Sequence, residues 1–309
     1  MDGSARSWYF STVLRRAGIA GEGPIQVAFH RTKYGRELLI DAAFVGQMPT
    51  FFRPGPHVLD FHDILVVTRG RGSFLLDGSP HRVAPGVALF TLPGQVREWR
   101  VPRGLDGACL FFTQEFVSET FSDPRFLDQF AYFAPDRYSA RLALRPAERR
   151  LFLDRFRAMQ REIAALRDDA PEALRALLYE TLVLLKRWYA ARHGQPAAAT
   201  SGLVEDFRRL VERDFTRRHR VADYAADLGI SPGHLSALCR SRLRASAGAL
   251  IRARITLEAK RLLLYSNLTA AQVADRLGFD DAAYFARFLR REAGAPPSRL
   301  RLRERRPSR

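Results

Sequence analysis

Cysteine is scarce in this 309-residue sequence, and long apolar runs are missing from it. The two cysteines, Cys109 and Cys239, lie far apart in the chain, so a disulfide framework is excluded and a reducing compartment is favoured. No stretch approaches the roughly 20 apolar residues that a membrane-spanning helix requires. The first 20 residues lack an apolar core and carry three arginines, unlike a secretory signal. We therefore expect a soluble, cytoplasmic protein without a membrane partner.

The motifs of common enzymes are missing as well. The sequence contains no nucleophile elbow, no phosphate-binding glycine loop and no cysteine–histidine cluster with zinc spacing. We therefore expect a protein that is not an enzyme, with no catalytic residue and no cofactor.

Acidic residues are outnumbered. There are 50 Lys+Arg against 33 Asp+Glu, a formal net charge of +17, and residues 201–309 hold 23 basic and 12 acidic residues, a net +11. A basic balance of this size favours a polyanionic partner, and we expect double-stranded DNA. An arginine-rich, solvated surface is the alternative, and it applies more to the first 200 residues than to the rest.

Residues 25–113 have the pattern of β-structure. Short alternating or apolar runs are separated by Gly, Pro and Asp turns, which favours a sandwich or barrel. The expected strands are Ile25–Phe29, Leu38–Val45, Ile64–Thr68, Ser73–Leu76, Ala88–Leu92 and Ala108–Thr113.

The stretch from Phe61-His-Asp-Ile-Leu-Val-Val-Thr-Arg-Gly70 through Pro85-Gly86-Val87 to Leu92-Pro-Gly-Gln-Val-Arg97 resembles a cupin barrel. It is most similar to the small-molecule-sensing cupin of AraC/XylS-type regulators, over roughly residues 50–115. Metal-binding cupins use histidines and a carboxylate as ligands. By this resemblance His57 and Asp63 match two ligand positions, but Leu59 and Arg97 occupy two histidine positions. We therefore expect no metal site.

A second use of the barrel is to bind an organic ligand. The candidate contacts are His57, His62, Arg97 and Trp99, with an anion at Arg97. The alternative, that these four are ordinary strand-end or surface residues, stays open at this point.

Residues 146–193 change to helical periodicity. Phe152, Phe156, Met159 and Ile163 recur every three or four residues, and after a break near Asp168–Pro171 a leucine-rich stripe continues to Trp188. Two amphipathic helices here can pack on the barrel or on a second chain, and the resemblance implies a homodimer. Residues 194–202 are small and include Pro and Gly, as in an interdomain linker.

Two segments of the C-terminal third have nearly the same pattern. Tyr224-Ala-Ala-Asp-Leu-Gly-Ile230 and Val273-Ala-Asp-Arg-Leu-Gly-Phe279 each join an apolar helical turn to a glycine, and an amphipathic helix follows each. This is the signature of a helix-turn-helix, in which glycine allows the tight turn. Ser231-Pro232 and the pair Asp280 or Asp281 predict the starts of the two following helices, and a long helix over 247–265 connects the units.

The outward faces of these two following helices are the candidate DNA contacts. They comprise Ser231, Gly233, Ser236, Ala237 and Arg240 in the first helix, and Ala282, Ala283, Ala286, Arg287, Arg290 and Arg291 in the second. Arg287 is the best candidate for a bidentate contact to guanine, with Ser236 and Arg240 next. Arg252, Arg254, Arg290, Arg291 and the Arg301–Arg306 tail are candidates for phosphate contacts.

Residues 203–303 resemble the DNA-binding domain of the AraC/XylS family, most specifically in Leu277-Gly-Phe-Asp-Asp-x-x-Tyr-Phe-x-x-Phe288. The resemblance implies two recognition helices in successive major grooves. The expected fold is α+β and multidomain: a cupin-like ligand-sensing barrel (1–145), a helical dimerisation or packing segment (146–193), a linker (194–202) and an all-α double helix-turn-helix domain (203–309).

The expected function is a sequence-specific transcriptional regulator that responds to a small-molecule effector through its barrel. Two alternatives are a cupin-type metal enzyme with a helical tail, and a DNA-binding regulator whose barrel serves only to dimerise. An apolar, filled barrel interior would favour the last.

Overall fold

The computed structural model describes residues 24–48, 51, 55–100, 104–119, 126–133, 139–194, 202–243 and 245–302. The chain divides into two compact units, one within residues 24–196 and the other within residues 197–309. Most of the predicted linker, residues 195–201, lies outside the described residues, and so do Arg244 and the tail from residue 303 onward.

The first unit contains two five-stranded sheets. One sheet has the order β1 (Ile25–Val27), β3 (His57–Leu59), β8 (Val96–Arg100), β5 (Gly72–Leu76) and β6 (Ser79–Val83). The other has the order β10 (Arg141–Ala143), β7 (Val87–Thr91), β4 (His62–Arg69), β9 (Asp106–Phe112) and β2 (Ile40–Phe44). All pairings are antiparallel except β1 with β3. The β-rich fold predicted for residues 25–113 is confirmed, and it consists of these two sheets.

Strand β4 divides its side chains between two cores. Side chains alternate along a strand, so Leu65 and Val67 belong to the cluster between the two sheets, whereas Ile64 and Val66 belong to the cluster on the helical side. Both clusters are buried, which explains why β4 is a nearly continuous apolar run. We call the space between the two sheets the barrel interior.

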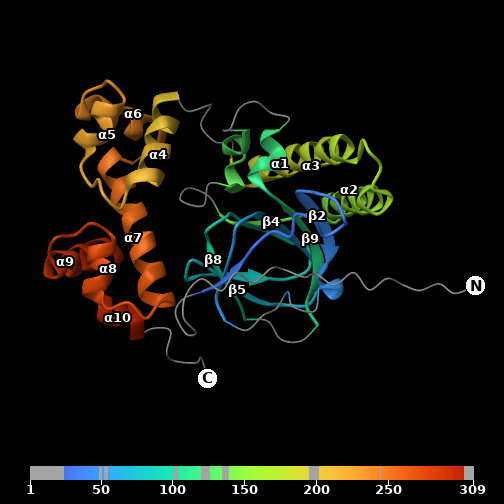
Figure 1. The fold of residues 1–309 in the computed structure, drawn as a ribbon, viewed down its shortest axis with the longest axis horizontal. Coiled ribbons are helices and arrows are strands. Elements are labelled where there is room, and N and C mark those ends of the chain that lie inside the picture. Colours follow the sequence, from blue (N-terminus) through green and yellow to red (C-terminus); the bar gives the residue numbers. More distant parts are fainter. Residues whose placement is uncertain are drawn as a thin grey trace, which may run out of the picture. The chain divides into compact units, whose positions relative to one another are not determined.

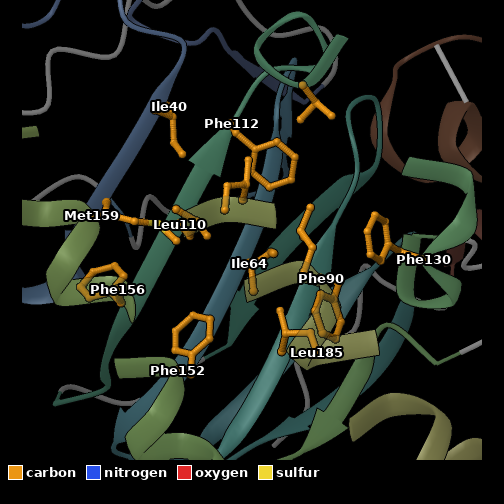
Figure 2. Close-up of a cluster of buried hydrophobic side chains, with 14 of the residues drawn as sticks. Ile40, Ile64, Phe90, Leu110, Phe112, Phe130, Phe152, Phe156, Met159 and Leu185 are labelled. Carbon is orange, nitrogen blue, oxygen red and sulfur yellow. The ribbon is translucent and has the colours of Figure 1, made fainter. Parts of the chain in front are cut away.

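Helices α2 (Pro146–Ala165) and α3 (Ala170–His193) cover the outer face of the second sheet. Figure 2 shows Phe152, Phe156 and Met159 of α2 directed at strand residues such as Leu110. The predicted apolar stripes therefore pack against the unit's own sheet. Tyr189 extends the α3 stripe, since it is buried and donates a hydrogen bond from its hydroxyl to the Ser139 carbonyl at 2.8 Å.

Shorter helical pieces occur in the connections between strands. They are the 3-10 turns Val45–Gln47, Phe126–Gln129 and Ala131–Phe133, and the helix α1 (Gln114–Ser118).

Four strands were not predicted from the sequence: β3, β6, β8 and β10. In β3 and β8 the buried positions include His57 and Arg97, so polar residues replace the apolar ones that mark a strand. These strands carry three of the four candidate ligand contacts.

Within its described residues, 202–243 and 245–302, the second unit forms helices and no strands. Its helices are α4 (Gly202–Asp214), α5 (Val221–Asp227), α6 (Pro232–Leu243), α7 (Ala247–Tyr265), α8 (Ala270–Arg276), α9 (Ala282–Ala293) and α10 (Pro297–Leu302). Figure 1 shows α7 running from the group α4–α6 to the group α8–α10. The predicted pair of helix-turn-helix units joined by a long helix is confirmed. Among the helices of the described residues, none is both long and apolar enough to cross a bilayer.

The substitution Phe156→Ala tests the core between sheet and helices. Phe156 is 1% exposed and its ring centroid lies 5.0 Å from that of Phe44. Removing a buried ring should lower the free energy of unfolding of this unit by about 3–5 kcal/mol. Urea unfolding followed by circular dichroism measures the loss. The exposed neighbour Arg157→Ala is the control and should change it by less than about 0.5 kcal/mol. Similar values for both variants would contradict this packing.

Candidate functional site

The first helix-turn-helix consists of α5, the turn at Gly229 and α6. Gly229 has φ of +65°, a conformation that favours glycine. The Ser231 hydroxyl then caps α6 by accepting a hydrogen bond from the His234 N–H at 3.2 Å. Leu235 and Cys239 are fully buried and hold α6 against the unit. Leu238, one position before Cys239, is partly exposed.

The second helix-turn-helix repeats this arrangement with one difference. Gly278 has φ of +71°, and the Asp281 carboxylate caps α9 by accepting from Ala283 N at 2.8 Å and Tyr284 N at 3.1 Å. The cap residue thus follows the glycine by three positions, against two in the first unit. Helix α8 begins with a capping box, in which the side chains of Thr269 and Gln272 each accept a hydrogen bond from the backbone N–H of the other residue.

The predicted outward faces of α6 and α9 are accessible. Nine of their residues are exposed and two are partly exposed. The exposed residues are Ser231, Gly233, Ala237, Arg240, Ala282, Ala283, Arg287, Arg290 and Arg291, and the partly exposed ones are Ser236 and Ala286.

Two exposed side chains on these faces were not among the candidates. His234 and Tyr284 occupy equivalent places in the first turns of α6 and α9, and Tyr284 is 51% exposed despite its size. Aromatic residues are usually assigned to a core, so periodicity alone missed Tyr284. Its position three residues after the cap residue Asp281 was the available signal. Each residue adds a ring to the candidate interface in the first turn of its helix.

The arginines of the interface differ in how strongly they are held. The Arg287 side chain is 68% exposed; its guanidinium lies 3.7 Å from the Asp281 carboxylate and 5.9 Å from the Tyr284 ring centre. Arg291 pairs with Glu292 at 2.8 Å. Exposed pairs of this kind are weak, so both cations can exchange their partner for a phosphate or a base.

Arg254, in contrast, is held within the unit. It pairs with Glu212 at 2.7 Å and Glu258 at 3.0 Å, and its guanidinium lies 3.9 Å from the Phe215 ring centre. Its side chain is only 13% exposed. Arg252 pairs with Glu292 at 3.0 Å. These contacts give Arg254 a packing role within the unit, and its phosphate contact stays a prediction.

The barrel interior contains a buried polar group of three residues. The Arg97 Nε donates to His57 Nε2 at 2.7 Å, and Arg97 Nη1 forms a short ion pair with Asp63. All three residues are below 5% exposed. Because Arg97 always carries its hydrogen at Nε, the accepting His57 nitrogen is the unprotonated one. We call His57, Asp63 and Arg97 the barrel triad.

The barrel triad leaves hydrogen-bonding capacity unused. Asp63 Oδ1 is buried and has no hydrogen-bond partner among the described residues. Burial raises the pKa of the Asp63 carboxyl, and the Arg97 guanidinium opposes that rise. Since the Asp63 carboxylate pairs with Arg97, the charge of the arginine is already balanced inside the protein. This pairing disfavours the binding of an anion at Arg97, which the sequence predicted. Sequence reasoning matched Asp63 only to a metal-ligand position and did not include it among the ligand contacts.

Aromatic side chains border the barrel triad. The Trp99 ring centre lies 4.4 Å from that of Phe74 and 5.5 Å from that of Phe51, and the Arg97 guanidinium lies 5.4 Å from the Phe51 ring centre. Within the described ranges, no three His, Cys, Asp or Glu side chains gather where they could share a metal ion.

His62 does not join this group. Because it precedes Asp63 on strand β4, its side chain points to the opposite face, where it stacks on Phe112 with ring centres 5.0 Å apart. Burial lowers the pKa of His62 to about 4, so its ring is neutral at pH 7. The structure thus brings together three of the four candidate ligand contacts and separates His62.

Two family models match the chain, one in each unit. A model described as an AraC-like ligand binding domain matches residues 42–182, and one described as a helix-turn-helix domain matches residues 224–303. The chain belongs to the AraC family of transcriptional regulators. This AraC-type regulator therefore combines a ligand-binding domain with a helix-turn-helix DNA-binding domain.

The AraC-type regulator has a relative that matches most of its length. The arabinose operon regulatory protein of Salmonella typhimurium is 26% identical over 256 residues, which cover 81% of this chain and 87% of the relative.

Solved structures give partial likenesses. The C-terminal domain of AraT, a response regulator from Geobacillus stearothermophilus, is 25% identical with a TM-score of 0.33 and covers 35% of this chain and 89% of its own. ToxT from Vibrio cholerae is 11% identical with a TM-score of 0.39 and covers 86% of this chain and 98% of its own.

The substitution His62→Phe tests the pKa of His62. An unfolded chain protonates this histidine near pH 6.5, whereas the folded chain protonates it near pH 4. The wild type should therefore be most stable above pH 6.5 and lose about 3 kcal/mol from this group as the pH falls to 4. The variant has no histidine at this position, so its free energy of unfolding should not show this decrease between pH 6.5 and 4. Urea unfolding from pH 4 to 7.5 measures the difference, and parallel curves for both proteins would contradict the shift.

Proposed function

We propose that this AraC-type regulator binds a specific DNA sequence by placing α6 and α9 in successive major grooves. The observation that carries the proposal is the pair of capped helices with exposed outer faces on one compact unit. Helix α7 between them has 19 residues, or about 28 Å at 1.5 Å per residue. This length is comparable with the roughly 34 Å of one turn of the duplex.

The two helix faces divide the recognition between contact types. Small residues such as Ala282 and Ala286 let the backbone approach the groove and can contact thymine methyl groups. Arg287 supplies the bidentate contact to guanine, while Arg290 and Arg291 hold the phosphates. The basic balance of this unit strengthens binding to any duplex, so Arg287 carries much of the selectivity.

The proposal extends to an effector that binds in the barrel interior. The supporting observation is the barrel triad, a donor and acceptor set buried beside the aromatic rings of Phe51 and Trp99. A ligand that donates a hydrogen bond to Asp63 Oδ1 and accepts one from Arg97 would complete the hydrogen bonds of the barrel triad. Such a ligand would act by binding more tightly to one conformation of the regulator than to another.

The domain roles follow the predicted boundaries. Residues 1–145 bind the effector, residues 146–193 support the barrel and contribute to a homodimer, residues 194–202 link the domains, and residues 203–309 bind DNA. The function that remains as an alternative is a regulator without an effector. It is favoured by the many apolar side chains of the barrel interior, among them Leu65, Phe74 and Phe111.

Arg287→Ala tests the recognition of bases. Loss of the Arg287 guanidinium should reduce discrimination between a duplex selected from a random library and a scrambled duplex by about 10–100-fold. The reason is that one bidentate contact contributes about 1–3 kcal/mol. Arg290→Ala is the matched control. It removes the same charge from the same helix and should weaken binding to both duplexes alike. Gel retardation of the full chain across salt concentrations measures both effects, and equal behaviour of the variants would refute the assignment.

Trp99→Phe tests the barrel as the effector site. A compound that raises the unfolding temperature of the wild-type chain in a small-molecule screen should raise that of the variant less, because the aromatic wall is altered. His62→Phe, on the face of the second sheet that points away from the barrel interior, should respond as the wild type does. Equal stabilisation of all three proteins would place the effector outside the barrel.

A further inference from the structure

The two helix-turn-helix turns have the same sequence pattern and different surroundings. At Gly229, an added Cβ atom would meet nothing within 4 Å. At Gly278, an added Cβ atom would lie 2.2 Å from the Thr216 carbonyl oxygen, far closer than atoms can approach. Both glycines have a positive φ, so the turn geometry alone does not explain this difference. The second turn rests against another part of the unit.

The part that it meets is the segment between α4 and α5, residues 215–220, which leads directly into the first helix-turn-helix. This segment is firmly held. Phe215 is 8% exposed, with the Arg254 guanidinium 3.9 Å from its ring centre, and the Tyr224 hydroxyl donates to the Arg218 carbonyl at 2.8 Å. Any residue that contacts this segment is therefore held at a fixed position relative to α5.

A second contact lies beside the first. The His219 ring centre is 4.8 Å from that of Phe279, the residue after Gly278. Phe279 in turn lies 5.1 Å, between ring centres, from both Phe285 and Phe288 on the inner face of α9. His219 Nε2 is buried without a hydrogen-bond partner among the described residues, so this side of the ring contributes packing only.

We propose that residues 215–220 form a second joint between the two helix-turn-helix units, beside α7, and that Gly278 and His219 are positioning residues that set the spacing of the two recognition helices. A single helix can bend and twist, whereas two separate attachments fix both motions. The ion pair between Arg252 of α7 and Glu292 of α9 supports the same geometry. The inference rests on the proposed reading of DNA by both helices.

The experiment compares Gly278→Ala with Gly229→Ala in the full chain. Both substitutions place alanine in a left-handed turn at a similar backbone cost, but only the first also drives a Cβ atom into Thr216. Sites are selected from a random duplex library for each protein. The wild type and Gly229→Ala should select two elements at the same spacing.

Gly278→Ala should bind the wild-type site about tenfold more weakly, because a misplaced second helix loses the gain from joint binding. It should either prefer a changed spacing or bind through one element only. Its affinity for a duplex with a single element should match that of Gly229→Ala.

A second pair of variants covers the case in which Gly278→Ala does not fold. His219→Ala loosens the joint without backbone strain and should broaden the tolerated spacing. Thr216→Ala keeps the carbonyl that meets Gly278 and should behave as the wild type. Folded joint variants that keep the wild-type spacing preference would overturn the inference alone. A wild type that selects one element would overturn the two-groove proposal, and the inference with it.

Discussion

The N-terminal unit depends on one constraint, the burial of strand β4 on both faces. Its neighbours β7 and β9 satisfy its backbone, so its side chains must suit two interiors at once. Its buried side chains are apolar except those of His62 and Asp63, and of these two only Asp63 faces the barrel interior. A buried carboxylate needs a cation and hydrogen bonds, and Arg97 supplies them from the opposite sheet. The polar centre of the barrel is therefore a consequence of the strand that organises the fold.

In the DNA-binding unit, net charge is a poor guide to the cations that face a ligand. Several arginines serve the fold: Arg254 is stacked and doubly paired, and Arg218 pairs with Asp227 while its carbonyl accepts a hydrogen bond from Tyr224. What distinguishes α9 is that its arginines are exposed on a helix whose other face is fully buried. DNA recognition is therefore supported by the location of the positive charge and not by its total.

The sequence was a better guide to helices than to contacts between distant residues. Helices α2, α3 and α7 follow from apolar residues at a spacing of three or four, and the starts of α6 and α9 follow from Ser231 and Asp281. Strands β3 and β8 did not follow, because buried His57 and Arg97 interrupt the alternation. The barrel triad joins three strands, and the contact of Gly278 with Thr216 distinguishes two turns of the same sequence pattern. Neither can be found by local pattern analysis.

The extra residue in the second turn has a consequence for how this domain can diversify. The two glycines are 49 positions apart, but the buried pairs Leu235 and Phe285, and Cys239 and Leu289, are 50 apart. The added length is absorbed between Gly278 and Asp281, where Asp280 is exposed. A helix-turn-helix unit can therefore gain or lose a residue in this turn without repacking its core. Such changes allow the two helix-turn-helix units to acquire different DNA sequence preferences while the fold of the domain stays the same.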